Sequence, residues 1–207
     1  MAGVRRVARR ILWLRGDPEG IRELKRRLPL LRPQGIHITF DPSSRWDVAV
    51  APVPGSPEAK TVRESAEGPA IFDPDPLRSL MLALAFPRGA FSTLKVGVDP
   101  GLRSCGVGAV ADGLVVEAES LPCDLVVSVV ERLVRLVPAC RYDVVLGSGS
   151  GWENLASGLA RVGIAFRVAD EMGTTGAGEI LPVRIKDRNA RAAVALALRA
   201  DVNNIKR

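Results

Sequence analysis

Residues 96–108 have the sequence VGVDPGLRSCGVG. Val96–Val98 predicts a buried strand, Pro100-Gly101 a tight turn, and residues 105–108 the start of a second strand. Asp99 therefore stands at the tip of a core strand, where burying a charge is costly. Such a group usually holds a metal or a cationic partner, or titrates abnormally. The stretch also predicts the start of a second domain near the middle of the chain.

Outward from this stretch, residues 91–207 predict three strands followed by alternating helices and strands, which is the order of the RNase H-like fold (βββαβαβα). Asp112-Gly113 between two apolar runs predicts a hairpin. The first helix of this domain should bury Leu125, Val129, Leu133 and Leu136. The predicted strands are 94–99, 105–111, 114–119, 143–146 and 165–168, and the predicted helices are 122–137, 152–162 and 187–200.

Residues 1–90 predict a smaller α/β domain with the order βαββαβα and helices on both faces of a mostly parallel sheet. The pattern is similar to a flavodoxin-like or receiver-like domain, but the chemistry of those domains is missing. Neither a GxGxxG nor a GxxxxGK motif is present. Pro52 and Pro54 occupy the end of the predicted strand 48–53, where a receiver would carry an aspartate. We therefore expect this domain to be structural or to bind a protein partner.

Composition favours an anionic partner, nucleic acid above all, because the net charge is +6 and the pI is about 9.8. The alternative is that the arginine bias reflects genome composition or a hot habitat. The three cysteines form no CxxC and have no histidine nearby, so a zinc site is not expected. An odd cysteine count without a signal peptide fits a reducing cytoplasm, and the apolar run at residues 11–14 is too short for a membrane span.

Three motifs in residues 91–207 resemble the RuvC and YqgF families, which are Holliday-junction-resolvase-like nucleases. The first is VGVDPG at residues 96–101 with Gly106, and the second is DEMGTT at residues 170–175. In the second motif Met172 stands where the family has arginine. The third is the alanine-rich helix that opens at Asp187. Residues 1–90 lie outside the resemblance.

The resemblance implies a metal-dependent nuclease with Asp99 and Asp187 as metal ligands and Glu171, or instead Asp170, as a third acid. The residues support this independently, because each acid follows a predicted strand or opens a helix, and such ends gather at one edge of a parallel sheet. Carboxylates about 4 Å apart repel by about 4 kcal/mol at an effective dielectric constant near 20, unless a cation is shared. Mg²⁺, or Mn²⁺, suits carboxylate oxygens. Each acid could instead simply cap a turn or a helix, or lie exposed in a loop.

Two departures from the family pattern count against catalysis. The strand that carries a glutamate in RuvC-like enzymes ends here in GSGSG at residues 147–151, and Ala190 stands where the last helix often has a second aspartate. The Gly/Ser loop could hold a backbone phosphate or form a flexible turn. The residues expected to contact nucleic acid are Ser148, Ser150, Thr174, Thr175, Arg184, Lys186, Arg188 and Arg191. The four basic ones could instead be a solvated helix face paired with acids.

Three functions remain open at this point. The first is a nuclease that cuts four-way DNA junctions or precursor ribosomal RNA. The second is a non-catalytic nucleic-acid-binding or ribonucleoprotein component. The third is an actin-like ATPase using the loop at residues 147–151, although that architecture needs two RNase H-like units. The resemblance also implies a homodimer, because a junction has two symmetric strands to cut, but the sequence identifies no dimer face.

Overall fold

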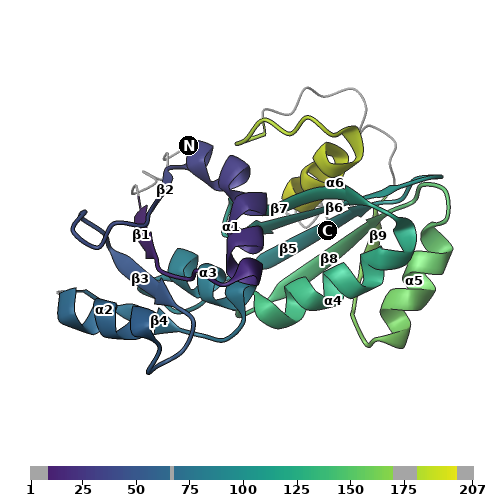
Figure 1. Cartoon of the computed structure of the whole chain (residues 1–207). Helices are drawn as coiled ribbons and strands as arrows, with labels where there is room; N and C mark the ends of the chain where they lie inside the picture. Colours follow the sequence, from purple (N-terminus) through teal and green to yellow (C-terminus); the bar gives the residue numbers. More distant parts are fainter. Residues whose placement is uncertain (1–8, 66–67, 170–180, 200–207) are drawn as a thin grey trace. The chain divides into compact units, whose positions relative to one another are not determined.

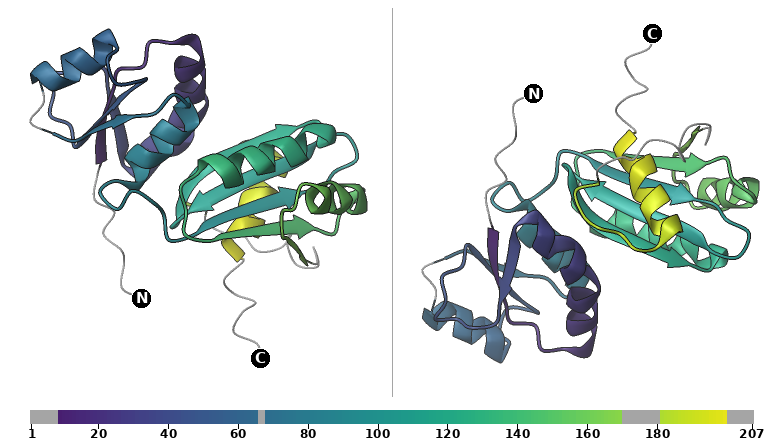
Figure 2. Two further views of the ribbon diagram at one scale, coloured as in Figure 1. Left: turned by 90° about the horizontal axis from the view of Figure 1, so that it is seen from below. Right: turned by 90° about the horizontal axis from the view of Figure 1, so that it is seen from above.

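The structure is a computed structural model, and it describes residues 9–65, 68–169 and 181–199. The chain divides into two compact units, the first mainly residues 1–90 and the second mainly residues 91–207. Each unit has a central sheet with helices on both of its faces (Figures 1 and 2), which confirms the expected α/β class. The longest described helix has 14 residues, and none of the described helices combines the length and hydrophobicity that a membrane crossing requires.

The first unit contains a four-stranded parallel sheet in the order β2-β1-β3-β4. Its first helix begins where the sequence predicts, since the Asp17 carboxylate caps it by accepting a hydrogen bond from the Gly20 amide at 2.7 Å. The strands are β1 (Arg9–Trp13), β2 (Ile36–Thr39), β3 (Val48–Ala51) and β4 (Ala70–Phe72), and the helices are α1 (Pro18–Leu31), α2 (Pro57–Ser65) and α3 (Pro76–Ala85). A 3-10 turn, η1 (Arg32–Gln34), links α1 to β2.

A buried arginine occupies the carboxyl edge of this sheet, where open α/β sheets usually bind ligands. Arg15 is 4% exposed, and its guanidinium donates to the carbonyls of Asp73 at 2.6 Å and Pro74 at 2.8 Å and to the Asp17 carboxylate at 3.0 Å. Burial alone would raise the pKa of Asp17, but hydrogen bonds from the Gly20 amide and Arg15 lower it below its usual value. These contacts are consistent with a structural role for Arg15 at this edge of the sheet. Binding of a protein partner by the first unit stays a prediction.

The second unit contains a mixed five-stranded sheet in the order β7-β6-β5-β8-β9. Strand β6 is antiparallel to β5 and β7, and β5, β8 and β9 are parallel. This order of elements agrees with the sequence prediction and is consistent with an RNase H-like fold. The strands are β5 (Leu94–Asp99), β6 (Cys105–Ala111), β7 (Leu114–Leu121), β8 (Tyr142–Gly147) and β9 (Arg167–Ala169), and the helices are α4 (Val126–Leu136), α5 (Trp152–Arg161) and α6 (Arg188–Arg199).

The buried face of α4 differs from the predicted one. Val126, Val130 and Leu133 are buried, whereas Leu125 is 48% exposed. The chain passes through a 3-10 turn, η2 (Cys123–Leu125), before the α-helix begins at Val126. This turn leaves Leu125 outside the α-helix. The row of buried side chains therefore begins at Val126, one residue later than the sequence predicted.

Three glycines let α6 lie directly on the sheet. A Cβ atom on Gly97 would lie 2.0 Å from the Ala193 carbonyl oxygen, and one on Gly106 would lie 2.1 Å from the Asn189 carbonyl oxygen. A Cβ atom on Gly108 would lie 2.5 Å from the backbone nitrogen of α6 at Val194. Any larger residue at these positions would collide with helix backbone, which cannot move aside like a side chain. We call Gly97, Gly106 and Gly108 the glycine face.

We expect Gly97→Ala to destabilise the second unit by at least about 2 kcal/mol, because the new methyl group overpacks the contact between sheet and helix. Urea unfolding followed by circular dichroism measures the effect. Gly16→Ala is the control, since no atom lies within 4 Å of a Cβ atom there, and it should stay within about 0.5 kcal/mol of wild type. Equal stabilities of the two variants would contradict the close approach of α6.

Candidate active site

Asp99 is the last residue of β5 and lies on the sheet face that α6 covers. Residues two apart along a strand share a face, and Gly97 on the same strand contacts α6. In the antiparallel register Asp99 pairs with Gly106, which also contacts α6. The half-buried carboxylate therefore stands beside the first turn of that helix.

Asp187 caps the same helix. Its carboxylate Oδ1 accepts a hydrogen bond from the Ala190 amide at 2.9 Å, and its side chain is exposed. Since the Asn189 carbonyl lies against Gly106, the partner of Asp99, both aspartates lie at the same end of one sheet. Asp187 can be both an N-cap and a metal ligand, because the hydrogen bond from Ala190 uses only one of its two carboxylate oxygens.

The third proposed acid is not described. Glu171, the alternative Asp170, and the predicted contact residues Thr174 and Thr175 all lie outside the described residues. Within the described part of the chain, no three or more His, Cys, Asp and Glu side chains form a group that could hold a metal ion. The candidate site therefore consists of two described carboxylates, which is a number that Mg²⁺ accepts when water and phosphate oxygens complete its shell.

The two departures from the family pattern both lie at this site. The register pairs Val98 with Leu146, so the next residues, Asp99 and Gly147, end neighbouring strands side by side. A glutamate at position 147 would thus stand next to Asp99, and glycine leaves that place without a carboxylate. Ala190 is 1% exposed and belongs to the turn of α6 that meets Gly106. At that position a carboxylate would face the sheet rather than solvent.

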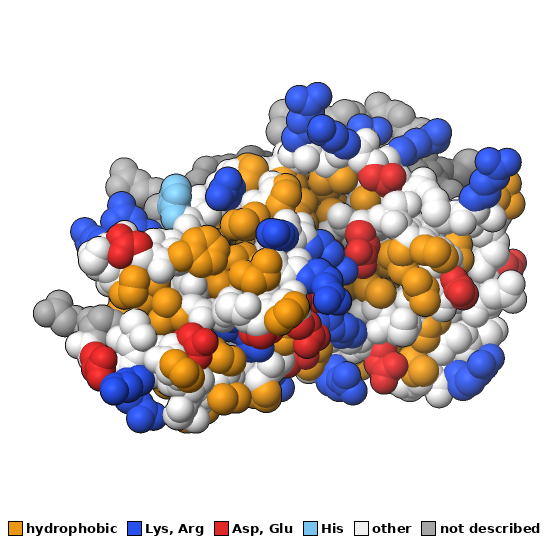
Figure 3. Space-filling view, in the orientation of Figure 1, with side chains coloured by type: hydrophobic (Ala, Val, Ile, Leu, Met, Phe, Trp, Pro, Cys, Tyr) orange, Lys and Arg blue, Asp and Glu red, His pale blue; other side chains and the backbone are white. Residues whose placement is uncertain are grey.

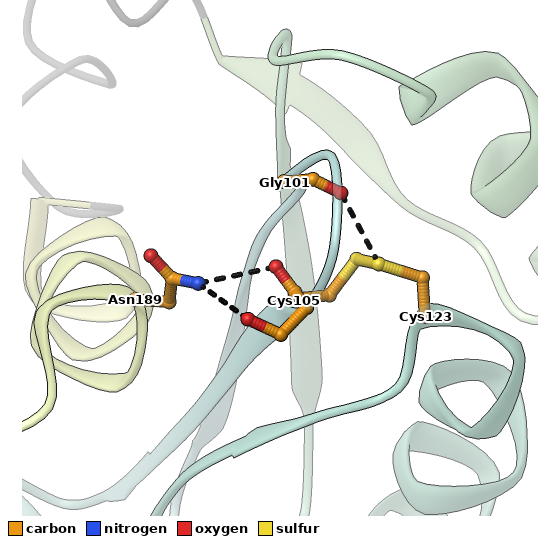
Figure 4. Close-up of a disulfide and its surroundings, with 5 residues drawn as sticks. Gly101, Cys105, Cys123 and Asn189 are labelled. Atoms are coloured by element: carbon orange, nitrogen blue, oxygen red, sulfur yellow. Dashed lines mark hydrogen bonds between the residues drawn. A yellow bond between two sulfur atoms is a disulfide. The ribbon is translucent and has the colours of Figure 1, made fainter.

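The turn after Asp99 is held from two sides (Figure 4). The Asn189 side-chain amide on α6 donates to the carbonyl oxygen of Ser104 at 3.1 Å and to its hydroxyl at 3.0 Å. On the other side a disulfide joins Cys105 at the start of β6 to Cys123, with 5.1 Å between their Cα atoms. Cys123 Sγ also lies 3.4 Å from the Gly101 carbonyl oxygen. We call Asn189 and this disulfide the turn clamp.

We did not expect this disulfide from the sequence. Its cysteines are 18 residues apart, and only the β6–β7 hairpin brings them together. The pairing weakens the inference drawn from an odd cysteine count, because only Cys140 is left as a free, exposed thiol. Intracellular disulfides do occur, notably in proteins of hyperthermophiles, so a cytoplasmic location stays a prediction.

A groove of about 490 Å³ runs beside the clamped turn, between the start of α4 and the length of α5. Ser150 and Gly151 line one part of it and Arg161 another. Gly151 caps α5 without a side-chain hydrogen bond, and the first turn of the helix contains one acid, Glu153. Asp124 also lines the groove. Ser150 lines this groove and Ser148 is exposed in the same loop, and phosphate contact by either residue stays a prediction.

The basic residues around Asp187 are exposed to solvent. None of them makes an ion pair with another residue in the described ranges. Asp170 and Glu171 lie outside those ranges, so a helix face paired with these acids stays an alternative. Figure 3 shows Lys and Arg side chains grouped above α6. We call this set the basic cluster; its members are Arg184, Lys186, Arg188 and Arg191.

Removing the disulfide with Cys123→Ser should lower the stability of the second unit by about 3 kcal/mol, the loop-closure value for a loop of this length. Thermal unfolding without reductant measures it, and Cys140→Ser, which removes the free thiol, should unfold like wild type. Dithiothreitol should lower the melting temperature of wild type but leave that of Cys123→Ser unchanged. Identical melting of wild type and Cys123→Ser would mean that the bond does not form.

No protein-family model and no curated protein matches this chain. Among solved structures it is similar to RuvC of T. thermophilus in complex with a Holliday junction substrate, at 19% identity and a TM-score of 0.40 over 51% of this chain and 90% of that one. A second Thermus thermophilus RuvC structure matches the same shares at 20% identity and a TM-score of 0.37. A Bacteroides thetaiotaomicron protein with an actin-like ATPase fold and unknown function matches at 15% identity and a TM-score of 0.31, over 54% of this chain and 46% of that one. Likenesses this distant assign neither a family nor an activity.

Proposed function

We propose that this protein is a divalent-metal-dependent nuclease that hydrolyses phosphodiester bonds in structured nucleic acid, either a four-way DNA junction or precursor ribosomal RNA. The observation that carries the proposal is that Asp99 and Asp187, nearly ninety residues apart in sequence, lie at the same end of one sheet. The basic cluster surrounds one of them. The motifs that resemble the RuvC and YqgF families add to this support.

The donor set fits a hard cation. Two carboxylates brought to one sheet end repel each other, and a shared Mg²⁺ or Mn²⁺ relieves the repulsion. When bound, such a metal supplies activation of the attacking water and stabilisation of the leaving oxygen. Asp99 and Asp187 would hold it, and Glu171 is the proposed third ligand. The turn clamp would keep the backbone after Asp99 in a fixed position, which catalysis by positioning requires.

The substrate backbone would be held by the surrounding cations and amides. Arg184, Lys186, Arg188 and Arg191 would neutralise phosphates beside the metal. Ser148 and Ser150 would contact a strand lying in the groove next to the clamped turn, and Thr174 and Thr175 are proposed to contact it as well. A homodimer would present two such sites to the two symmetric strands of a junction, with the first unit available for a protein partner.

A non-catalytic nucleic-acid-binding protein is the second candidate, and a specific observation favours it. Gly147 lies beside Asp99 and leaves that strand end without an acid, while Ala190 faces the sheet. A protein that had lost these acids would keep the basic cluster and the groove. It would bind with strong salt dependence, each phosphate contact contributing about 0.9 to the slope of log K against log salt concentration.

The deciding experiment compares cleavage of a four-way DNA junction and of a structured RNA by the full chain with Mg²⁺ or Mn²⁺. Mutating a residue that only hydrogen-bonds a metal ligand typically lowers metal affinity or activity by about 10- to 100-fold. Asp99 and Asp187 are proposed as direct ligands, so Asp99→Asn and Asp187→Asn should each lower the cleavage rate by at least about 100-fold. Asparagine caps a helix as well as aspartate, so Asp187→Asn keeps the start of α6 intact while it removes the charge. Glu131→Gln, an exposed acid on α4, is the matched control and should cleave like wild type.

Three outcomes separate the candidates. Metal-dependent cleavage that both aspartate variants lose supports the nuclease. Salt-sensitive binding of either substrate without cleavage, together with no carboxylate-dependent metal binding in calorimetry, supports the binding protein instead. Cleavage that Asp99→Asn leaves unchanged on both substrates would contradict the assignment of this site.

A further inference from the structure

We propose that the outer face of α1, in the first unit, is a second surface for the phosphate backbone of nucleic acid. Four cations are exposed along α1 and the η1 turn that follows it (Figure 1): Arg22, Lys25, Arg26 and Arg32. We call them the α1 cations. None of them belongs to the candidate active site or to the basic cluster, so the surface goes beyond the proposed function and does not rely on its chemistry.

The α1 cations lie on one side of the helix. Lys25 and Arg26 follow Arg22 by three and four residues, which places them on the same face. Arg32 caps the helix in a helical conformation and follows Lys25 by seven residues, or two turns. At a rise of about 1.5 Å per residue the row is roughly 15 Å long, which matches about four phosphates along one strand of a duplex.

The acids of α1 leave most of this charge uncompensated. The helix contains two acids, and Glu23 is buried in an ion pair with Arg27, which is also buried. Glu19, in the first turn, is the exposed one, so four cations and one acid give the outer face a net charge of three positive units. All of the α1 cations except Arg26 make no ion pair with another residue in the described ranges.

Helix α2 of the same unit shows a different charge pattern. It contains two acids and two cations, and the Lys60 ammonium lies 3.6 Å from the Glu64 carboxylate. Such mixed and paired charges are typical of a helix face that meets only solvent. In α1 like charges four residues apart repel each other and destabilise the helix. A polyanion lying along the face would relieve this repulsion, and nothing comparable is needed at α2.

The lack of apolar groups on the face favours nucleic acid over a protein or a membrane. Of the large hydrophobic side chains that are exposed in the described ranges, none belongs to α1 or η1. The centre of a protein interface is apolar, whereas an interface with nucleic acid is polar and positively charged. A helix that lies on a membrane inserts its apolar face, and in α1 that face is buried in the unit, as Leu24 and Leu31 show.

Both ends of α1 are fixed, so the cations project from a rigid support. Asp17 caps the start of the helix. Near its end the Gln34 side-chain amide donates to the Leu30 carbonyl at 2.8 Å. Contact with phosphates therefore requires ordering of the side chains alone, which limits the entropic cost of binding.

Fluorescence anisotropy of a labelled, continuous DNA duplex and of a labelled RNA hairpin tests this surface. The full chain is used without divalent metal, so cleavage does not affect the signal. The α1 variant carries Arg22→Gln, Lys25→Gln and Arg32→Gln. Three lost phosphate contacts should lower the slope of log K against log salt concentration by about 2.7 on the duplex, and the affinity at low salt should fall at least about 10-fold. An effect on one probe alone identifies DNA or RNA as the source of the phosphates.

The matched control removes the same amount of charge from elsewhere in the first unit. It replaces three exposed cations outside the α1 face by glutamine: Arg45, Lys60 and Arg63. This control should keep the salt slope and bind within about twofold of wild type, because its residues make no phosphate contact. Circular dichroism confirms that both variants are folded.

A third variant separates this surface from the proposed function. It carries Arg184→Gln, Lys186→Gln and Arg188→Gln in the basic cluster. Weaker binding by the α1 variant, with or without an effect of the third variant, supports the α1 surface. Weaker binding by the third variant alone contradicts the α1 surface and leaves the proposed nuclease site unaffected.

Two further results would overturn the proposal. One is an equal loss of salt slope in the α1 variant and in the matched control, which would mean that net charge alone acts. The other is binding to phosphatidylserine vesicles or to polyglutamate that needs the α1 cations and is at least as tight as binding to the duplex and the hairpin. That result would assign the face to a membrane or to an acidic protein instead.

Discussion

The second unit depends on the contact between the backbone of α6 and the glycine face. At Gly97 and Gly106 a single Cβ atom would come within about 2 Å of helix carbonyl oxygens, so only glycine allows the helix to lie this low. This close packing determines where the first turn of α6 lies relative to the sheet. Because Asp187 caps that beginning and Asp99 pairs with Gly106, the same contact brings both aspartates to one sheet end. The geometry of the candidate site is thus a consequence of glycine placement in two strands.

The turn clamp adds a second constraint at the same place. The segment between β5 and β6 contains no secondary structure of its own, and a free loop there would let the end of β5 fray. Asn189 attaches the segment to α6, and the disulfide attaches it to the start of the α4 region. The carboxyl end of the sheet is therefore held by two attachments.

Much of this architecture could be predicted from local signals. The spacing of apolar residues, the Asp112-Gly113 turn and the aspartate caps at Asp17 and Asp187 predicted elements that the structure contains, because these signals act within a few residues. The prediction for α4 was wrong at Leu125, where an unforeseen 3-10 turn changed the start of the helix.

What the sequence could not reveal depends on residues far apart in the chain. Cys105 and Cys123 carry no spacing signal, and their pairing follows only once the hairpin and η2 are in place. The roles of Glu171, Thr174 and Thr175 stay predictions.

The most direct test of the central claim, that α6 docking builds a metal site from Asp99 and Asp187, is a crystal structure of the full chain grown with Mn²⁺ and measured at a wavelength where manganese scatters anomalously. The account predicts one anomalous peak within about 2.3 Å of a carboxylate oxygen from each aspartate. A peak bound by neither residue, or carboxylates separated too widely to share an ion, would contradict it.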